Sequence, residues 1–293
     1  MGPRATLLAG PNWDLLRGRE LLRNLTAVGV SNSKEPDPEA AERVARSGCI
    51  LRGLVGSTVH GTANPGTDDR DEMGVCIEPP AYIAGLRPFE HWVFRTQPEG
   101  ASSGPGDLDL TVYGLQKYCR LALKGSPTVL LLLFVDGEFV LERHQLGAEL
   151  QALAPAFVSK WAGRAFLGYV DAQRRGLLGE RHATRTREVS VEHGYDTKYA
   201  MHALRIAYQG CELLDTGKIT LPIPDPERGM LMEIRRGEVP LEVVLDRLRE
   251  RSAQLEDTIL NSSLPDSPDR DAVDRFLVDA YRRAWAGELS LPD

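Results

Sequence analysis

Two pairs of residues close together in the sequence carry the types and the spacing that metal and phosphate chemistry needs. Asp69 and Asp71 are two residues apart, so on an extended strand their side chains leave from the same face. Two neighbouring carboxylates repel each other unless a divalent cation lies between them. Magnesium favours one or two carboxylates together with substrate phosphates. The Asp69–Asp71 pair therefore predicts a magnesium site beside a bound phosphate.

Gly56 and Ser57 follow an apolar run that ends at Val55. Glycine lets the backbone approach a phosphate closely, and serine adds a hydroxyl donor beside the backbone amides. A Gly-Ser pair alone is common in turns, and Asp-x-Asp alone is hardly more specific. Their ordered combination after an apolar strand is what indicates a loop that holds the terminal phosphates of a nucleotide next to the metal.

The elements that must position these residues can be predicted from the local pattern. Asp37 and Pro38 suit the start of a helix that runs to about residue 46, because the aspartate accepts free amides and proline fits the first turn. Ser47 and Gly48 would end this helix. Apolar runs bounded by turn residues then predict strands at residues 49–55, 69–77 and 107–112.

Beyond Tyr113 the apolar residues recur with the period of a helix, first from Leu115 to about Gly125. The fold class is therefore α+β, a small mixed-sheet domain followed by a helical domain. Further helices are expected at residues 159–178, 195–216, 240–259 and 269–286. We place an N-terminal segment and connector at residues 1–45, the mixed-sheet domain at 46–135 and the helical domain at 136–293.

Length and composition exclude several classes of protein. With 293 residues, of which 42% are hydrophobic and 26% charged, the chain reads as a globular protein of one or two domains. A net charge of -7 argues against a wholly basic surface but leaves room for one basic groove. The cysteines form no C-x-x-C pair and the histidines lack zinc spacing, so we expect reduced, mostly buried thiols and no zinc site. The longest apolar run, at residues 129–135, is too short to span a bilayer, and we expect a soluble cytoplasmic protein.

The stretch from Leu54 to Val75 resembles the signature of the DNA polymerase β-like nucleotidyltransferase superfamily, which is a strand, Gly-Ser, a short segment and Asp-x-Asp on the next strand. Because Gly74 closes the motif together with Val75, it is similar to the RNA-ligase-associated predicted nucleotidyltransferases, the RlaP or YcgL-like group. Residues 109–127 and 194–205 are similar to two further segments of that group.

This resemblance implies the ligands and the mechanism. Asp69 and Asp71, together with Asp109 on the third strand, would hold two Mg²⁺ ions, or Mn²⁺ in their place. The ions would orient a nucleoside triphosphate (NTP) and stabilise the transition state at its α-phosphate, with Asp109 on the side of the attacking hydroxyl. Because no covalent nucleophile is needed, positioning and charge neutralisation carry the catalysis.

Four positions leave parts of this assignment open. Ser126 stands where the group usually has asparagine, and His60 where a tyrosine is common; neither is an expected ligand. Asp68 could shift the register of the Asp-x-Asp pair by one, although it has no carboxylate two residues later. Asp107 shares the expected strand face with Asp109, so the third ligand is open between these two.

A basic helix face is a second candidate for contact with the triphosphate. Lys198, His202 and Arg205 fall at i, i+4 and i+7, and so share one face of the helix that begins near Asp196. The alternative is that Asp196 caps this helix and the three basic residues form a solvated face. An excess of positive charge between residues 160 and 205, above all in the loop at 181–187, could be the track of a nucleic-acid acceptor or an ordinary solvated surface.

The function implied by the resemblance is metal-dependent transfer of a nucleoside monophosphate from an NTP to the hydroxyl of a nucleic acid, such as an RNA or tRNA end in a repair reaction. One alternative is nucleotidylation of a protein or a small molecule, which the acidic overall charge would suit. The other is a non-catalytic nucleotide-binding module, against which the intact Asp69 and Asp71 count. These patterns specify neither the base of the nucleotide nor the oligomeric state.

Overall fold

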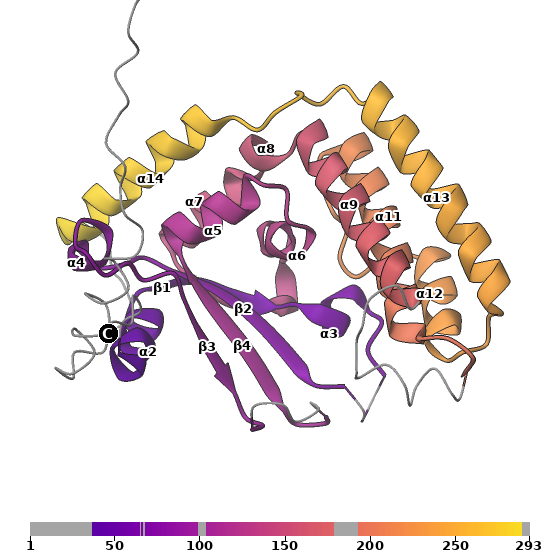
Figure 1. Cartoon of the computed structure of the whole chain (residues 1–293). Coiled ribbons are helices and arrows are strands. Elements are labelled where there is room, and N and C mark those ends of the chain that lie inside the picture. The colour runs from indigo at the N-terminus through magenta and orange to yellow at the C-terminus, as the bar shows by residue number, and fades with distance from the viewer. Residues whose placement is uncertain (1–36, 65, 67, 99–103, 179–192, 289–293) are drawn as a thin grey trace, which may run out of the picture. The chain divides into compact units, whose positions relative to one another are not determined.

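The computed structural model of the chain describes residues 37–64, 66, 68–98, 104–178 and 193–288. Within these residues the chain forms an α+β fold in which a five-stranded mixed sheet is followed by a series of helices, as the sequence predicted (Figure 1). Residues 36–293 form one structural unit.

The sheet of the described residues has the order β3-β4-β2-β1-β5. Strands β2 and β4 are parallel, and the other three pairs are antiparallel. The sequence pattern missed β3 and β5, which are short and lie at the two edges, and it placed the start of β4 one residue early. The strands are β1 (Cys49–Leu54), β2 (Arg70–Cys76), β3 (His91–Arg95), β4 (Leu108–Gly114) and β5 (Val140–Arg143).

The helices include all those expected from the apolar period. The first of these described helices in chain order are α2 (Pro38–Ser47), α3 (Gly56–His60), α4 (Pro80–Ile83), α5 (Leu115–Ala122) and α6 (Pro127–Leu130). They are followed by α7 (Gln145–Ala152), α8 (Ala154–Phe157), α9 (Lys160–Leu177), α11 (Thr197–Thr216), α12 (Glu227–Arg235), α13 (Leu241–Asn261) and α14 (Arg270–Trp285). The sequence pattern missed the short helices α3, α4, α6, α7, α8 and α12.

The two aspartates expected to cap helices behave differently. The side chain of Asp196 accepts hydrogen bonds from the amides of Lys198 and Tyr199, at 2.9 and 3.0 Å, and so begins α11 as predicted. Asp37 is the N-cap residue of α2 as predicted, but its side chain makes no capping hydrogen bond, so the expected bond to a free amide is absent. Pro38, which has no amide to satisfy, begins α2 instead.

The core joins the sheet to the helices. Buried residues of β1 and β2 pack with those of α5, α9, α11 and α14 in one large cluster, while α2 packs on the opposite face of the sheet. Helices α11, α12 and α13 share a second cluster. The four cysteines are buried and free, as expected. Because β5 belongs to the sheet, the sheet extends past residue 135, where the sequence pattern had placed a domain boundary.

The last helix holds the end of strand β2 in place. Glu78, which is buried just beyond β2, accepts a hydrogen bond of 2.5 Å from the Tyr281 hydroxyl of α14 and one of 3.0 Å from the Leu115 amide. The Trp285 indole donates to the Glu78 carbonyl at 2.8 Å. Among the described helices, none combines the length and apolarity that crossing a membrane requires.

Candidate metal and nucleotide site

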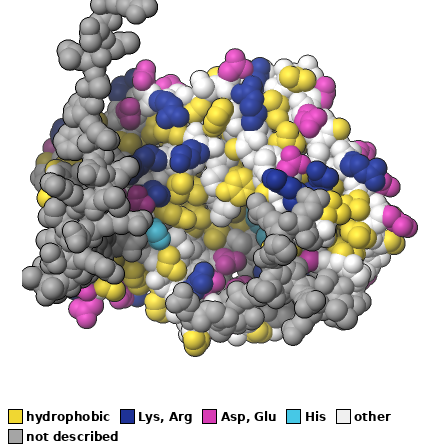
Figure 2. Space-filling model, in the orientation of Figure 1, with side chains coloured by type: hydrophobic (Ala, Val, Ile, Leu, Met, Phe, Trp, Pro, Cys, Tyr) yellow, Lys and Arg dark blue, Asp and Glu magenta, His cyan; other side chains and the backbone are white. Residues whose placement is uncertain are grey.

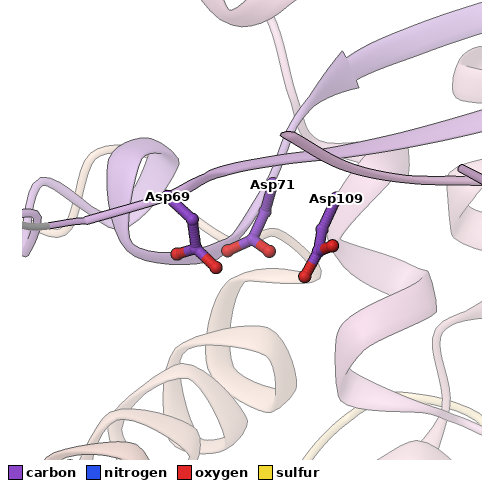
Figure 3. A group of neighbouring side chains, drawn as sticks. All are labelled: Asp69, Asp71 and Asp109. Carbon is purple, nitrogen blue, oxygen red and sulfur yellow. The ribbon is translucent and has the colours of Figure 1, made fainter. Parts of the chain in front are cut away.

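Parallel pairing of β2 with β4 brings three carboxylates together where these two interior strands begin. Asp71 lies opposite Asp109 in the register of the two strands, and Asp69 immediately precedes β2. One carboxylate oxygen from each residue lies within 4.8 Å of those of the other two, and all three residues are partly buried. The three side chains point to the same side of the sheet (Figure 3). We call this group the acidic triad.

The electrostatics of the acidic triad favour a cation. Burial and repulsion from Asp69 are the main causes that raise the pKa of Asp71 to about 6, a balance to which Lys198 contributes by lowering it and Asp109 and Asp68 by raising it. Carboxylate oxygens at this spacing are the donors that hard divalent cations such as Mg²⁺ take. The residues present therefore fit a divalent metal ion.

Gly56 allows Asp71 to occupy this position. Its φ is +65°, in the left-handed region that favours glycine, and a Cβ built on it would overlap the Asp71 carboxylate. The Val55 amide also donates to the Asp71 carbonyl at 2.9 Å, which ties the start of α3 to the start of β2. The sequence reasoning attributed Gly56 to the approach of a phosphate, whereas in this structure the side chain it lacks would collide with the triad itself.

The structure distinguishes the environments of Asp109 and Asp107. Asp109 is in β4, and the side chains that contact it include the Arg95 guanidinium at 3.2 Å and the Gln97 amide at 3.0 Å. Asp107 precedes β4, and its carboxylate accepts hydrogen bonds of 2.9 Å from the Thr96 hydroxyl and from the Gly104 amide. Asp107 thus ties down the loop before β4, and Asp109 is the residue brought to the triad.

Asp68 also lies outside the triad. Its Oδ2 accepts hydrogen bonds of 2.9 Å from the Ser57 hydroxyl and from the Asn64 amide, and its Oδ1 accepts one from Arg235 of α12. The shifted register that Asp68 left open is therefore not the one in which the carboxylates converge. The Ser57 hydroxyl, which the sequence reasoning assigned to a phosphate, donates its hydrogen bond to Asp68 in this structure.

The basic face of α11 divides into an exposed part and an enclosed part. Lys198 is exposed, yet near enough to Asp71 to lower its pKa. Arg205 instead makes hydrogen bonds with His60 Nε2 at 2.7 Å, with Gln209 Oε1 at 2.9 Å and with His202 Nδ1 at 3.2 Å. We call these four residues, His60, His202, Arg205 and Gln209, the His–Arg cluster. The alternative of a solvated basic face is wrong for His202 and Arg205.

Both histidines of the His–Arg cluster are held neutral. Burial, followed by the Arg205 charge, lowers the pKa of His60 well below its usual range and that of His202 to about 3. Neutral imidazoles can accept hydrogen bonds from a guanidinium, which is only a donor. His60, which the sequence singled out only as a departure from a pattern, is thus a buried partner of Arg205.

Sequence reasoning missed Arg235 because it predicted no helix there. The apolar Met230, Leu231 and Ile234 lie at helical spacing in α12 and were the available signal. No pattern links Arg235 to Asp68, since 167 positions separate them. The basic loop at 181–187 lies outside the described residues.

Comparison with known proteins gives the chain a family. Among solved structures, a nucleotidyltransferase-like protein from Exiguobacterium sibiricum 255-15 is similar, with 13% identity over 83% of this chain and 77% of that chain. Its TM-score is 0.29, so nothing about the site rests on it. A search of the curated proteins finds no match. The sequence profile of the RNA repair pathway DNA polymerase beta family (RlaP) matches residues 35–279. The chain therefore belongs to the RNA repair pathway DNA polymerase β family.

Proposed function

We propose that the chain is a metal-dependent nucleotidyltransferase that moves a nucleoside monophosphate from an NTP to a hydroxyl at the end of an RNA. The observation that carries this proposal is the convergence of three carboxylates beside the Gly56 turn, with the pKa of Asp71 raised to about 6 by burial and by its neighbours. Repulsion of this kind is relieved by a cation, and the family to which the chain belongs supplies the reaction class.

Each part of the site has a separate task under this proposal. Asp69, Asp71 and Asp109 would hold divalent metal, with two Mg²⁺ ions as the expected load and Mn²⁺ as the alternative. Bound metal would supply charge neutralisation at the triphosphate and a lowered pKa for the attacking hydroxyl. The exposed ammonium of Lys198 lies near the acidic triad and adds positive charge for the triphosphate. The short turn at Gly56 and Ser57 packs directly against the Asp71 carboxylate.

The face of the sheet that carries the acidic triad also offers aromatic side chains to an acceptor. Side chains alternate along β4, so Asp109, Thr111 and Tyr113 project from one face. On the neighbouring edge strand His91 pairs with Tyr113, and their rings lie 6.1 Å apart. The acidic triad and the two rings therefore lie on the same face of the sheet.

Helix α9 adds a further ring to this surface. Tyr169 is 42% exposed and lies near enough to add to the rise in the pKa of Tyr113 that burial causes. Val93 of β3 is 45% exposed and pairs with Thr111 in the register of the strands. Figure 2 shows hydrophobic side chains gathered in the middle of the described surface, with Lys and Arg side chains around them. Partly exposed rings on one face of the sheet suit stacking with the bases of a single strand, and they favour a nucleic-acid acceptor over a small molecule.

The test is transfer of label from each α-phosphate-labelled NTP, with Mg²⁺, to total tRNA, short RNA, DNA ends or no acceptor. We expect label on RNA with the wild type and none with the Asp69→Ala, Asp71→Ala double variant. Tyr169→Ala should raise the KM for RNA by about 10-fold and leave the KM for the NTP unchanged, because stacking on one ring contributes about 1–3 kcal/mol. Label on protein or on a small molecule would contradict the RNA assignment, and bound nucleotide without any transfer would contradict catalysis.

A further inference from the structure

Asp68 is the central acceptor of a small hydrogen-bond network beside the acidic triad. Its side chain is 14% exposed, and its Oδ2 receives the Ser57 hydroxyl and the Asn64 amide, each at 2.9 Å. These donors come from the first turn of α3 and from the backbone of the segment that joins α3 to β2. The carboxylate therefore closes this segment into a loop of fixed shape.

Arg235 attaches the same loop to the helical part of the molecule. From the last turn of α12 its Nη2 binds Asp68 Oδ1, and its Nη1 donates to the Thr62 carbonyl at 2.6 Å. The Thr62 amide in turn donates to the Ser57 carbonyl at 3.0 Å. The guanidinium is also only 14% exposed, so both charges of the pair lie mostly out of water and hold each other in place.

The bond to Asp68 limits what the Ser57 hydroxyl can do. A hydroxyl has one proton to donate, and in this structure that proton goes to Asp68. Phosphate oxygens at neutral pH accept hydrogen bonds, so Ser57 cannot donate to a phosphate while it keeps this bond. Its hydroxyl therefore braces the turn from within.

The neighbourhood of the acidic triad gives Arg235 a second effect. Asp68 is adjacent to Asp69 in the chain, and a free carboxylate there would add to the negative charge and compete for the cation. Arg235 neutralises Asp68 and turns one of its oxygens toward α12. The acidic triad is thereby left as the group that faces the metal.

We infer that Asp68 and Arg235 are positioning residues, which hold the Ser57 turn in the shape that receives the triphosphate and so make nucleotide affinity depend on α12. This inference rests on the proposed function, because it takes an NTP as the ligand of the turn. Neither residue needs to touch the reacting atoms, and both act through Ser57 and Thr62.

The first experiment compares Arg235→Gln with the wild type. Binding of a non-hydrolysable NTP analogue with Mg²⁺ is measured by calorimetry, together with KM and kcat for transfer. We expect the Kd and the KM for the NTP to rise about 10-fold or more, with kcat within about threefold, since the loss of one charge-assisted contact is of this order. Arg235→Lys should recover only part of the affinity, because an ammonium cannot make the two-pronged contact.

The matched control is Arg236→Gln. Arg236 is the next residue and pairs with Glu238 at 2.6 and 2.7 Å on the exposed surface, away from the turn. Its substitution should leave the NTP affinity unchanged. Thermal melts of every variant establish that the protein is folded, and Asp68→Asn, which keeps the shape of the side chain, repeats the test if Arg235→Gln does not fold.

A double-mutant cycle tests the role assigned to Ser57. If Ser57 acts through Asp68, the losses of affinity in Ser57→Ala and Asp68→Asn should not add in the double variant. Additive losses would show that Ser57 contacts the phosphate by itself, and they would overturn the claim that its hydroxyl acts through Asp68. Folded Arg235→Gln that binds the NTP analogue as well as the wild type would overturn the inference and leave the transferase proposal standing. A wild type that binds no NTP would overturn both.

Discussion

The acidic triad and the His–Arg cluster are two groups of ionisable side chains at the two ends of α3, and their electrostatics are opposite. In the acidic triad like charges converge, and the pKa of Asp71 rises because the site as it stands disfavours its charge. In the His–Arg cluster a single guanidinium is surrounded by neutral acceptors, which take hydrogen bonds from both of its Nη atoms, while its buried Nε has no hydrogen-bond partner.

The difference teaches how to separate a ligand site from a structural one. A group that is electrostatically unfavourable by itself gains most from a ligand of opposite charge, whereas a guanidinium whose two Nη atoms already donate to protein acceptors gains less. Arg205 was expected to meet the triphosphate because it shares a helix face with Lys198, but its hydrogen bonds assign it to the interior. The exposed Lys198 is the better candidate for contact with the substrate.

The largest effect should come from removing one charge of the acidic triad. Asp71→Asn should lower the rate of nucleotidyl transfer by about 10³-fold or more, because the metal loses a charged ligand, while the metal-free protein melts at the same or a higher temperature. The assay is labelled-NMP transfer at saturating Mg²⁺, followed by thermal melting in EDTA. Asp107→Asn is the control and should keep its activity, since that carboxylate bonds the loop before β4. If Asp71→Asn kept more than about a tenth of the wild-type activity, the assignment of Asp71 as a metal ligand would be wrong.

Arg205→Met should lose stability, whereas Asp71→Asn should lose activity and keep its stability. We expect the free energy of unfolding to fall by about 2–4 kcal/mol, because the buried His60 and Gln209 lose their charged donor. Urea denaturation measures this loss. Lys198→Met, on the same helix face but exposed, should change stability by less than about 0.5 kcal/mol and raise the KM for the NTP. A stable Arg205→Met variant that has lost NTP affinity would show that Arg205 contacts the substrate and does not serve mainly to stabilise the fold.

A smaller effect should appear in the dependence of stability on pH. The folded pKa of His202 is about 3, against 6.5 for a free histidine, so the unfolded state binds the proton first as the pH falls. The contribution of the neutral imidazole is therefore fully present above pH 6.5 and is lost toward pH 3, by up to about 1.4 kcal/mol per pH unit. Urea midpoints between about pH 7.5 and about pH 5 should fall less steeply for His202→Gln than for the wild type. Equal slopes would mean that His202 is not buried in its neutral form.

Much of the fold and part of the site were predictable from short-range patterns. The spacing of Asp69 and Asp71 needs only the alternation of a strand, and the long helices follow from their apolar period. The convergence of Asp109 with that pair depends on a parallel pairing that joins strands distant in sequence, which only the resemblance anticipated. Strands β3 and β5 are too short to carry a clear pattern. The contacts of Asp68 with Arg235 and of His60 with Arg205 exist only in the folded chain, since 167 and 145 positions separate the partners.

The hydrogen bonds between α14 and Glu78 join two segments that are synthesised at different times. Strand β2 carries Asp71 near its start, and just beyond its other end Glu78 is held by Tyr281, which lies 203 positions further along the chain than Glu78. Until the ribosome has released α14, the carboxyl of Glu78 lacks this hydroxyl donor, and α14 cannot yet cover its part of the sheet core. The end of β2 away from Asp71 therefore gains its full set of contacts only after α14, which is synthesised long after β2, has packed against the sheet core.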